Sequence, residues 1–456
     1  MISAVILAAG EGKRMKSNKS KVTHKALGKE LIKWVLDAAA NAGTQDVCVV
    51  VGHKEEQVRE TLKDEVSYVV QSEQKGTGHA VMMAEDFLKE RKGTVLLLCG
   101  DTPLITAETL QGLIKEHREN KNVCTLITAV LENPKGYGRI IRDENGFSAI
   151  IEHKDCSEEQ LKTKECNAGM YCIETEELLE SLKEIGCENA QNEYYITDIP
   201  KILSQKGHRV GTYILENNDE MLGINDRIQL AEATEELRKR SIKKHMEQGV
   251  TFINPNSCYV SFEAKIGMDT IIYPNCIIEG DTQIGEDCII GPDSRLVCAE
   301  IGDKTEINKS VVFDSKIGNE TKVGPFAYLR PGNVVGDYVK IGDFVELKKA
   351  QIGDGTKISH LTYVGDAEVG TDCNIACGAV TVNYDGSKKY LTKIGNDCFI
   401  GCNVNLVAPV EIEDEAYVAA GSTIVNNVPN KSLAIGRAHQ VNKEGWVEEK
   451  GRYKRK

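Results

Sequence analysis

A six-residue repeat fills the C-terminal third of the chain, from about residue 266 to 424, and constrains its fold more than any other feature. Its units include IGMDTI, IYPNCI, IGEDCI, IGDKTE and IGNDCF, in which every sixth residue is usually Ile, Val or Leu and Gly often follows. A period of six fits neither a helix nor an alternating strand. It predicts short strands joined by tight turns, each pointing one aliphatic side chain into a narrow prism. Three strands make one coil, so we expect a parallel β-helix of about nine stacked coils, with Gly supplying backbone freedom at the corners.

An antiparallel, Gly-rich sandwich is the alternative fold for this stretch. It would show alternation broken by turns about every 8–12 residues. The six-residue register persists through too many units for that interpretation.

The composition of the 456 residues, 41% hydrophobic and 27% charged, is that of a globular protein with room for two or three domains. A net charge of −13 argues against general binding to nucleic acid or to acidic membranes. No apolar run approaches the ~20 residues of a membrane span. The short N-terminal apolar run has no basic region ahead of it, so it indicates a strand and not a signal peptide.

Fifteen cysteines without a compact framework indicate a reducing, cytoplasmic location. The pairs Cys373/Cys377 and Cys398/Cys402 have a CxxxC spacing that could suggest a metal site. In a hexapeptide prism, however, positions i and i+4 need not converge, and Cys is a good small core residue. We therefore expect these cysteines to be structural.

The first half of the chain alternates apolar strands with helical segments. The expected strands include residues 4–10, 46–52, 66–71, 94–101 and 124–131, and the expected helices 31–43, 55–64, 78–91 and 107–120. This order predicts an α/β, Rossmann-like sheet covered on both sides. A mixed α/β segment extends to about residue 225, and one long polar helix, stopped at Gly249, follows it. The expected domains are therefore 1–226, a linker helix 227–249, and a β-helix domain with a C-terminal tail, 250–456.

The expected carboxyl ends of the N-terminal strands carry polar and Gly-rich segments, where ligands bind in such sheets. In LAAGEGKRM, glycines let backbone N–H groups approach a phosphate, and Lys13, Arg14 and Lys21 add positive charge. The loop is neither a Walker A loop nor a dinucleotide GxGxxG. Asp101 ends the buried run LLLCGD, where a carboxylate could hold Mg²⁺ or simply cap a helix.

In the repeat region, the informative positions are those that break the six-residue rule, because a solenoid accepts insertions only at its corners. The longest insertion surrounds Asn383 and Tyr384. His360 interrupts a corner close to Tyr363, and the cations Arg330 and Lys348 are nearby in the stack. A lone His is usually a surface or hydrogen-bonded residue, but this setting favours a general base.

Several ordered motifs resemble those of one known family. LAAGEGKRM, SKV, QSEQKGTGHA, CGD, GYGRI, EHKD, NAGMY, EYYITD and GIND resemble the uridylyltransferase half of the bifunctional bacterial enzymes that make UDP-N-acetylglucosamine. FAYLRPG, ELKKA, SHLTYVGDAEVG and VNYDG resemble the acetyltransferase half of the same family. The resemblance covers essentially the full chain. It implies a left-handed β-helix of the hexapeptide-repeat acyltransferase type and a cytoplasmic enzyme that supplies precursors of the cell wall.

For the N-terminal half, the resemblance implies transfer of UMP from UTP to N-acetylglucosamine-1-phosphate, with release of pyrophosphate. The implied site consists of Leu7, Ala8, Ala9 and Gly10 at the uracil and ribose, Lys21 at phosphate, Gln71, Gly76 and Thr77 at uracil, Asp101 and Asn225 at Mg²⁺, and Gly138, Glu152 and Asn167 at the sugar. Such a reaction needs alignment and charge neutralisation more than a nucleophilic side chain.

For the C-terminal half, the resemblance implies transfer of an acetyl group from acetyl-CoA to the amine of glucosamine-1-phosphate. The implied site consists of His360 as general base, Arg330 and Lys348 at the sugar phosphate, Tyr363 and Asn374 at the sugar, Asn383 and Tyr384 on the acetyl-CoA side, Cys377, Cys402 and Ala420 lining the coenzyme, and Arg437 at its phosphates. Related prisms pack as three parallel copies, so we expect a homotrimer.

The sequence departs from the family pattern at five positions. Lys13 replaces a Thr, Ser20 a Pro, Cys99 an aromatic residue, Cys377 an Ala and Cys402 a Ser. None of these changes removes a charge needed for catalysis. Two other interpretations remain open at this point: a nucleotidyltransferase with a regulatory or assembly β-helix, as in ADP-glucose pyrophosphorylase, and a non-catalytic assembly protein.

Overall fold

The computed structural model describes residues 1–144, 146–189 and 191–451. Contacts divide the chain into two compact units, Met1–Leu237 and the part from Arg238 onward, so the division falls inside helix α8, Arg227–Glu247. The domain limits expected at residues 226 and 249 bracket this helix. No helix in the described ranges is long and apolar enough to cross a membrane.

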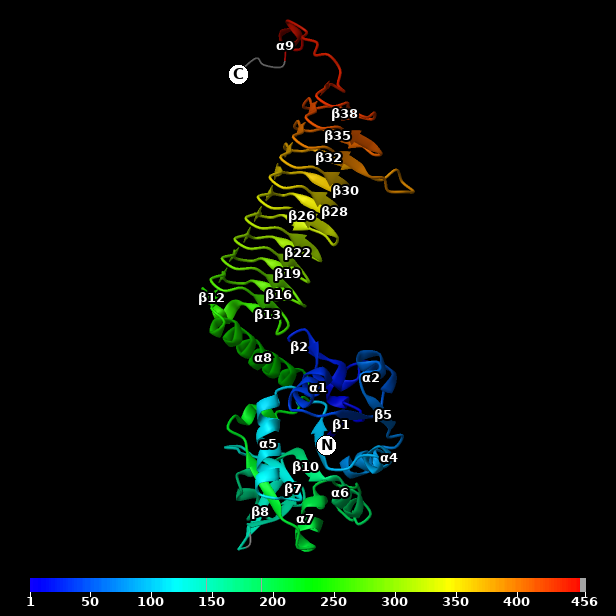
Figure 1. The fold of residues 1–456 in the computed structure, drawn as a ribbon, viewed down its shortest axis with the longest axis vertical. Coiled ribbons are helices and arrows are strands. Elements are labelled where there is room, and N and C mark those ends of the chain that lie inside the picture. The colour runs from blue at the N-terminus through cyan, green and yellow to red at the C-terminus, as the bar shows by residue number, and fades with distance from the viewer. Residues whose placement is uncertain (145, 190, 452–456) are drawn as a thin grey trace. The chain divides into compact units, whose positions relative to one another are not determined.

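The N-terminal unit is built on a mixed sheet with the strand order β11-β7-β10-β6-β1-β4-β5 (Figure 1). Its strands are β1 Ile2–Leu7, β4 Asp46–Val51, β5 Ser67–Val70, β6 Thr94–Cys99, β7 Cys124–Val130, β10 Glu165–Glu174 and β11 Val210–Ile214, and the hairpin β8 Arg139–Asp143 and β9 Gly146–Ile151 adds to one side. Strands β1, β4, β5 and β6 are parallel, whereas β10 runs antiparallel to both β6 and β7.

Helices cover both faces of this sheet, as the sequence predicted. They are α1 Leu31–Asn41, α2 Glu55–Leu62, α3 Thr77–Met82, α4 Glu85–Lys89, α5 Ala107–Glu119, α6 Thr175–Leu182 and α7 Asp198–Gln205. Successive residues of β1 enter different cores: Ala4 and Ile6 pack with α1 and α5, and Val5 packs with α3, α4 and α6. A strand buried on both faces must be apolar at every position, which is why this one reads as a continuous hydrophobic run.

One predicted helix is divided in two. The run expected as a helix over residues 78–91 is interrupted between α3 and α4, where Met83 and Ala84 form a turn. Ala84 and Leu88 are both fully buried in the same core as Val81. The turn thus lets two short helices bury their apolar faces against one side of the sheet.

The second unit is a parallel β-helix, seen in Figure 1 as a stack of short arrows from β12 to β38. One of its sheets contains β12 Thr251–Phe252, β15 Ile271–Ile272, β18 Ile289–Ile290, β21 Glu306–Ile307, β24 Lys322–Val323, β27 Lys340–Asp343, β29 Lys357–His360, β31 Asn374–Ile375, β34 Phe399–Ile400, β37 Tyr417–Val418 and β39 Leu433–Ala434. These eleven strands extend the stack beyond the residues 266–424 expected from the repeat.

The other two edges of the prism form one continuous curled sheet. The strands of one edge are β13 Tyr259–Val260, β16 Ile277–Glu279, β19 Arg295–Val297, β22 Val311–Phe313, β25 Tyr328–Leu329, β28 Glu346–Ile352, β30 Tyr363–Val369, β32 Val380–Val382, β35 Asn405–Val407 and β38 Thr423–Ile424. Those of the other edge are β14 Lys265–Ile266, β17 Gln283–Ile284, β20 Glu300–Ile301, β23 Ser315–Ile317, β26 Asn333–Val335, β33 Thr392–Ile394 and β36 Val410–Ile412. The C-terminal halves of β28 and β30 also belong to this edge, where they pair with β26 and β33.

The aliphatic residue of each six-residue unit points into the prism, as expected. Ile266, Ile272, Ile278, Ile284 and Ile290 all belong to one buried core. Because each coil supplies three such side chains and its backbone bonds to the next coil, the core is continuous along the stack.

Some glycines of the repeat, such as Gly324 with a φ of 105°, supply the expected backbone freedom, but others have a different purpose. Gly267 does not have a positive φ; a Cβ there would lie 2.6 Å from the backbone of Gly285 in the next coil. The positive φ of the corner belongs instead to Asp269, at 59°, because Asp tolerates the left-handed region better than most residues. Gly267 therefore permits close stacking, and the neighbouring polar residue makes the turn.

The C-terminal part of α8 packs on the first coil of the β-helix. Arg238 Nη1 donates to the carbonyls of Pro255 (2.6 Å) and Cys258 (3.1 Å), and Ser241 Oγ donates to Ser261 O at 3.3 Å. His245, one turn further on, is fully buried. Burial, aided by the adjacent Lys244, lowers the pKa of His245 to about 4.

This buried histidine predicts acid sensitivity of the β-helix unit. Below pH ~6.5 the unfolded chain gains a proton on His245 that the folded chain accepts only near pH 4. Unfolded chains then bind more protons, so the free energy of unfolding falls as the pH drops through this window, by up to about 3 kcal/mol. We expect His245→Gln to flatten the dependence of the urea midpoint on pH between 7 and 4.5. The matched control, His439→Gln at an exposed site, should keep the wild-type slope, and an unchanged slope in His245→Gln would refute the assignment.

Candidate functional site

The carboxyl ends of β1 and β6 border a cavity of about 280 Å³ in the N-terminal unit. Its lining is Leu7, Ala8, Ala9, Gly10, Lys21, Val22, Gln71, Gln74, Gly76, Thr77, Ala80, Cys99, Asp101 and Glu193. The structure thus brings together all the residues expected at uracil, ribose and phosphate, along with Asp101. Neighbouring parallel strands have their carboxyl ends at the same edge of the sheet, which explains why segments that are far apart in the sequence meet there.

Two oxygen donors in this site face a single cation. Lys21 Nζ forms an ion pair with Asp101 Oδ2 and donates to Asn225 Oδ1 at 3.2 Å. The side chains of Lys21 and Asp101 are 15% and 19% exposed, so the ion pair is largely shielded from solvent. The backbone holds this arrangement because Ile224 N donates to Asp101 O at 2.8 Å. A carboxylate and an amide oxygen that already share a positive charge form a donor set suited to Mg²⁺.

The loop from Gln71 to Thr77 has a backbone shape that only Gly permits. Gly76 has a φ of 105°, and a Cβ there would lie 2.5 Å from Tyr194 O. Gln71 is buried, and its Nε2 donates to Gly76 O at 3.0 Å and contacts His79 Nδ1 at 3.1 Å. His79 was not expected from the sequence, because no motif singled it out from the other histidines.

The three residues expected at the sugar form a second group. Asn167 N donates to Gly138 O at 2.9 Å, and a Cβ on Gly138 would lie 3.5 Å from Glu152 Oε1. Burial raises the pKa of the Glu152 carboxyl. Cys99 lies between this group and the cavity. It lines the cavity, and its thiol donates at 3.5 Å to the carbonyl of Gly169, two residues after Asn167. Burial, reinforced by Asp101, raises the pKa of Cys99 to about 12, so this thiol is not a nucleophile at neutral pH.

In the β-helix unit, side chains from stacked coils form a polar cluster. Lys348 Nζ lies 3.4 Å from Asp366 Oδ2, and Asn383 Nδ2 donates to the same carboxylate oxygen at 2.5 Å and to Tyr363 OH at 3.4 Å. Lys348 and Asp366 are 18 residues apart, one coil of the stack. Sequence reasoning missed Asp366, which is unremarkable in the repeat and becomes central only when the coils stack.

Arg330 and His360 each meet a carboxylate of a neighbouring coil. Arg330 Nη1 lies 3.1 Å from Glu346 Oε1. His360 Nδ1 lies 2.5 Å from Asp343 Oδ1. The sequence pointed to Arg330 and His360. Their carboxylate partners, Glu346 and Asp343, are identified by the structure alone.

The insertion expected around Asn383 and Tyr384 projects from the coil between β32 and β33 (Figure 1). Asp385 Oδ1 accepts hydrogen bonds from the backbone N–H groups of Ser387 and Lys388, both at 2.7 Å. These bonds lower the pKa of the Asp385 carboxyl to about 2. A turn with this internal bonding has a defined shape and holds the exposed Tyr384 outside the prism.

The residues expected at the coenzyme follow one corner of the stack. Asn403 N donates to Cys377 O, and Gly421 N donates to Cys402 O, both at 2.8 Å. Arg437 lies beside this corner, since a Cβ on Gly421 would be 3.8 Å from its Cδ. Asn374 is separate: it is in register with Lys357 on another edge of the prism and is not brought into the Lys348 cluster.

The two cysteines within each CxxxC pair do not converge, although Cys373 and Cys398 of the different pairs contact each other through a side-chain hydrogen bond. Cys373 and Cys398 are buried and donate to Gly395 O (2.9 Å) and Glu413 O (3.1 Å), whereas Cys402 is exposed. Among the residues that the structure describes, no group of His, Cys, Asp and Glu is arranged to hold a metal by itself. Cys373 and Cys398 therefore lie in the hydrophobic core of the prism.

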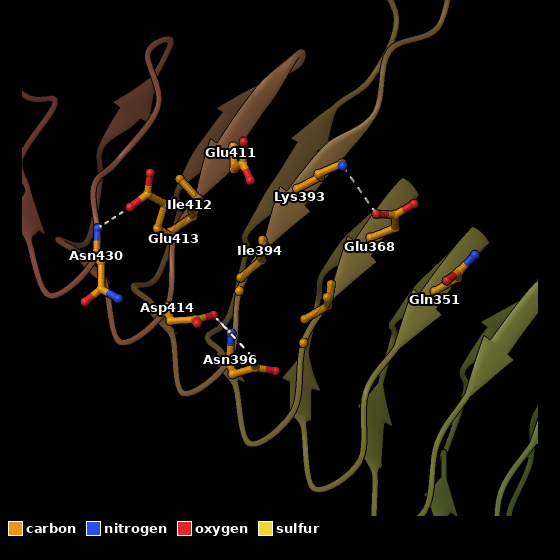
Figure 2. Close-up of a pocket in the computed structure, with 13 residues that line it drawn as sticks. Gln351, Glu368, Lys393, Ile394, Asn396, Glu411, Ile412, Glu413, Asp414 and Asn430 are labelled. Carbon is orange, nitrogen blue, oxygen red and sulfur yellow. Dashed lines mark hydrogen bonds and ion pairs between the residues drawn. The ribbon is translucent and has the colours of Figure 1, made fainter.

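A groove of about 560 Å³ on another face of the β-helix contains none of the expected residues (Figure 2). Figure 2 shows side chains stacked one coil apart, with Lys393 paired to Glu368 at 3.9 Å and Asp414 accepting from Asn396 N at 2.7 Å. These charged and polar groups pair with one another along the stack, as is usual on a solvent-exposed face.

The site geometry defines a class: a nucleotidyltransferase domain joined to a hexapeptide-repeat transferase. Comparison with known proteins agrees. The nucleotidyl transferase family matches residues 3–225, and the bacterial transferase hexapeptide (six repeats) family matches residues 263–297 and 391–426.

Curated relatives cover nearly the whole chain. The bifunctional protein GlmU of Acetivibrio thermocellus is 57% identical over 451 residues, 99% of this chain and 98% of the relative. The proteins of the same name from Clostridium beijerinckii and Clostridium acetobutylicum are 52% and 51% identical, each covering 98% of both chains. The chain belongs to the bifunctional GlmU family. It is a bifunctional enzyme, a uridylyltransferase and an acetyltransferase, as the sequence predicted.

The geometry of the loop from Gln71 to Thr77 generates a prediction about Gly76. Gly76→Ala adds a methyl group that collides with Tyr194 O at a positive φ, so we expect uridylyl transfer to fall at least about tenfold and acetyl transfer to stay unchanged. Gly43→Ala is the matched control, because Gly43 has a φ of 96° with nothing within 4 Å of the added Cβ. Equal activities of the two variants would show that the collision is not what constrains the loop.

Proposed function

We propose that the two clusters are the two active sites of the enzyme, with the residue roles expected from the family resemblance. The observation that carries the proposal is that the residues expected at uracil, ribose and phosphate converge in one unit, and three of the residues expected at acetyl transfer converge in the other. The cavity beyond β1 and β6 gathers the nucleotide set, and the stacked coils gather Lys348, Tyr363 and Asn383. The β-helix therefore carries a reaction of its own, which disfavours a purely regulatory or assembly role.

In the N-terminal site, UTP would lie along the loop Leu7–Gly10 with its uracil against Gln71, Gly76 and Thr77. Lys21 would bind phosphate, and Glu152, Asn167 and Gly138 would hold N-acetylglucosamine-1-phosphate. The phosphate oxygen of the sugar attacks the α-phosphorus of UTP, and pyrophosphate leaves. Because the nucleophile is already ionised, the protein contributes alignment and positive charge.

Asp101 and Asn225 would hold Mg²⁺ in this site. Their oxygens fit the ion, as their shared contact with the Lys21 ammonium indicates. When bound, Mg²⁺ supplies charge neutralisation for the phosphates. The residues present give too few ligands for a metal held by protein alone, so phosphate oxygens would complete its coordination.

In the C-terminal site, Arg330 and Lys348 would bind the phosphate of glucosamine-1-phosphate, with Tyr363 and Asn374 at the sugar. Asn383, Tyr384, Cys377, Cys402, Ala420 and Arg437 would hold acetyl-CoA. His360 would take a proton from the sugar amine as its nitrogen attacks the thioester carbonyl carbon. The carbon–sulfur bond then breaks, and the products are an amide and the coenzyme thiol. An ammonium has no lone pair, so a base is required.

The enzyme would act as a homotrimer with the acetyl-transfer site between subunits. Supporting this, Phe326 and Phe344 stack at one corner of the prism with ring centroids 5.4 Å apart, yet they are 52% and 56% exposed. Leu361 continues this apolar corner on the next coil and is also exposed. The corner adjoins His360, whereas Asn374 is in register with Lys357 at the far end of the same edge, so a neighbouring subunit would be needed to complete one site.

Separate sites predict separable losses. His360→Ala should lower acetyl transfer by about 10²–10⁴-fold and leave uridylyl transfer nearly intact. Asp101→Ala should do the reverse, since it removes the charged oxygen donor of the nucleotide site. Acetyl transfer is measured with glucosamine-1-phosphate and acetyl-CoA, and uridylyl transfer is measured separately with N-acetylglucosamine-1-phosphate, UTP and Mg²⁺. Equal loss of both activities in either variant would contradict independent sites.

The exposed aromatic corner predicts the oligomeric state. Sedimentation at micromolar concentration should give a trimeric mass for the wild type, and Phe326→Ser with Phe344→Ser should dissociate it and abolish acetyl transfer alone. Tyr338→Ser is the control, because this aromatic residue is also exposed but lies at another corner. A monomeric wild type with full acetyltransferase activity would sink the trimer proposal.

A further inference from the structure

The contact between His360 and Asp343 is produced by the stacking of two coils. Asp343 ends β27, His360 ends β29, and the two residues are direct partners in the parallel pairing of these strands. Their side chains therefore leave the same corner, one above the other, and His360 Nδ1 reaches Asp343 Oδ1 at 2.5 Å. In the described part of the chain, His360 Nε2 makes no hydrogen bond, so one ring nitrogen is engaged and the other is available.

The backbone around both residues is fixed. Leu361 N donates to Asp343 O at 3.0 Å, and Thr362 Oγ1 donates to His360 O at 2.6 Å. Gly342, just before Asp343, allows the coils to approach closely: a Cβ at this position would lie 1.9 Å from Ser359 O. The carboxylate is thus held against the imidazole by the stack itself, and rotation of either backbone is prevented.

We propose that Asp343 is a positioning residue for His360, accepting the Nδ1–H hydrogen bond so that the neutral imidazole presents its Nε2 lone pair to the substrate amine. The inference rests on the proposed role of His360 as general base. A neutral imidazole has one N–H, and a carboxylate at Nδ1 selects the tautomer that carries it there. Without this partner, part of the population would present a protonated, unreactive Nε2 to the amine.

The carboxylate also supports the charged intermediate state of the base. When Nε2 takes the proton from the attacking amine, the ring becomes an imidazolium next to a negative charge. The hydrogen bond with His360 lowers the pKa of the Asp343 carboxyl below its ordinary value, so Asp343 is ionised at neutral pH. The proton that His360 takes from the amine is then passed to the departing thiolate, so the reaction returns the imidazole to its neutral form.

The remaining charged groups near His360 come from three coils. Lys340 belongs to the same strand as Asp343 and acts on its carboxyl, while Lys357 is at the far end of β29. On the coil above, the register of β29 with β31 places the uncharged Cys377 at the level of His360. On the adjoining edge, Tyr363 follows His360, and the Glu346 beneath it is engaged by Arg330. Among the residues that the structure describes, Asp343 is the one carboxylate in direct contact with the ring.

The test is the pH profile of acetyl transfer by full-length Asp343→Asn. This change keeps the size of the side chain and removes its charge, so we expect kcat to fall about tenfold or more, with KM for glucosamine-1-phosphate changed less than about twofold. The acid limb of this profile should shift to lower pH, because removal of the neighbouring anion disfavours protonation of the imidazole. Asp343→Glu, which restores the carboxylate, should recover part of kcat and the original limb.

Three controls separate this inference from the proposed function. Glu368→Gln removes one negative charge from another face of the same stack, and it should leave the acid limb unmoved. Unchanged uridylyl transfer and unchanged sedimentation would show that Asp343→Asn is folded. In the double variant with His360→Ala, Asp343→Asn should cause no further loss.

The outcomes are distinguishable. If His360→Ala retains acetyl transfer, the proposed base is wrong. If His360→Ala is inactive but Asp343→Asn keeps the wild-type kcat and acid limb, Asp343 does not position the base. The same conclusion follows if Asp343→Asn loses activity without any shift of the acid limb.

Discussion

The structure of the β-helix depends on one repeated interaction, the parallel hydrogen bonding of each coil to the next. Ile271 pairs with Ile289, and Ile289 with Glu306, so residues about one coil apart are always neighbours. The buried aliphatic core and this backbone ladder fix the register together, because a slip would turn inward side chains outward. Everything on the outer surface is then placed by the same register, including the side chains that do chemistry.

The two units build their sites in different ways. In the N-terminal unit, the site lies where parallel strands end, and loops that are distant in sequence converge on that edge. In the β-helix, the site is a vertical arrangement, in which Asp343 meets His360 and Lys348 meets Asp366 one coil away. The first arrangement tolerates variation in the loops. The second requires the stack to remain regular beneath each functional residue, which is why Gly342 cannot accept a side chain without displacing the coil above.

Close packing also explains what the departures from the family pattern can do. Cys99 lies beside Asp101 in the nucleotide cavity, but burial keeps its thiol protonated, so it serves as a small packing group. Cys402 is exposed at the corner that would face the coenzyme. Lys13 is exposed and paired with Glu11, and Ser20 is fixed through its backbone by Gln57 at 2.7 Å. These positions surround the proposed sites without supplying a charge to them.

The sequence by itself determined the kind of fold in each half, because periodicity and buried apolar runs are local signals of secondary structure. It also identified the residues with unusual chemistry for their setting, such as His360, Lys348 and Asp101. It did not reveal the division between α3 and α4, the close-packing purpose of Gly267, or the carboxylates Asp343 and Asp366. Each of these depends on what lies one coil or one layer away. Asp343 is an ordinary repeat residue in the chain, and only the stacking of two coils makes it the partner of a histidine.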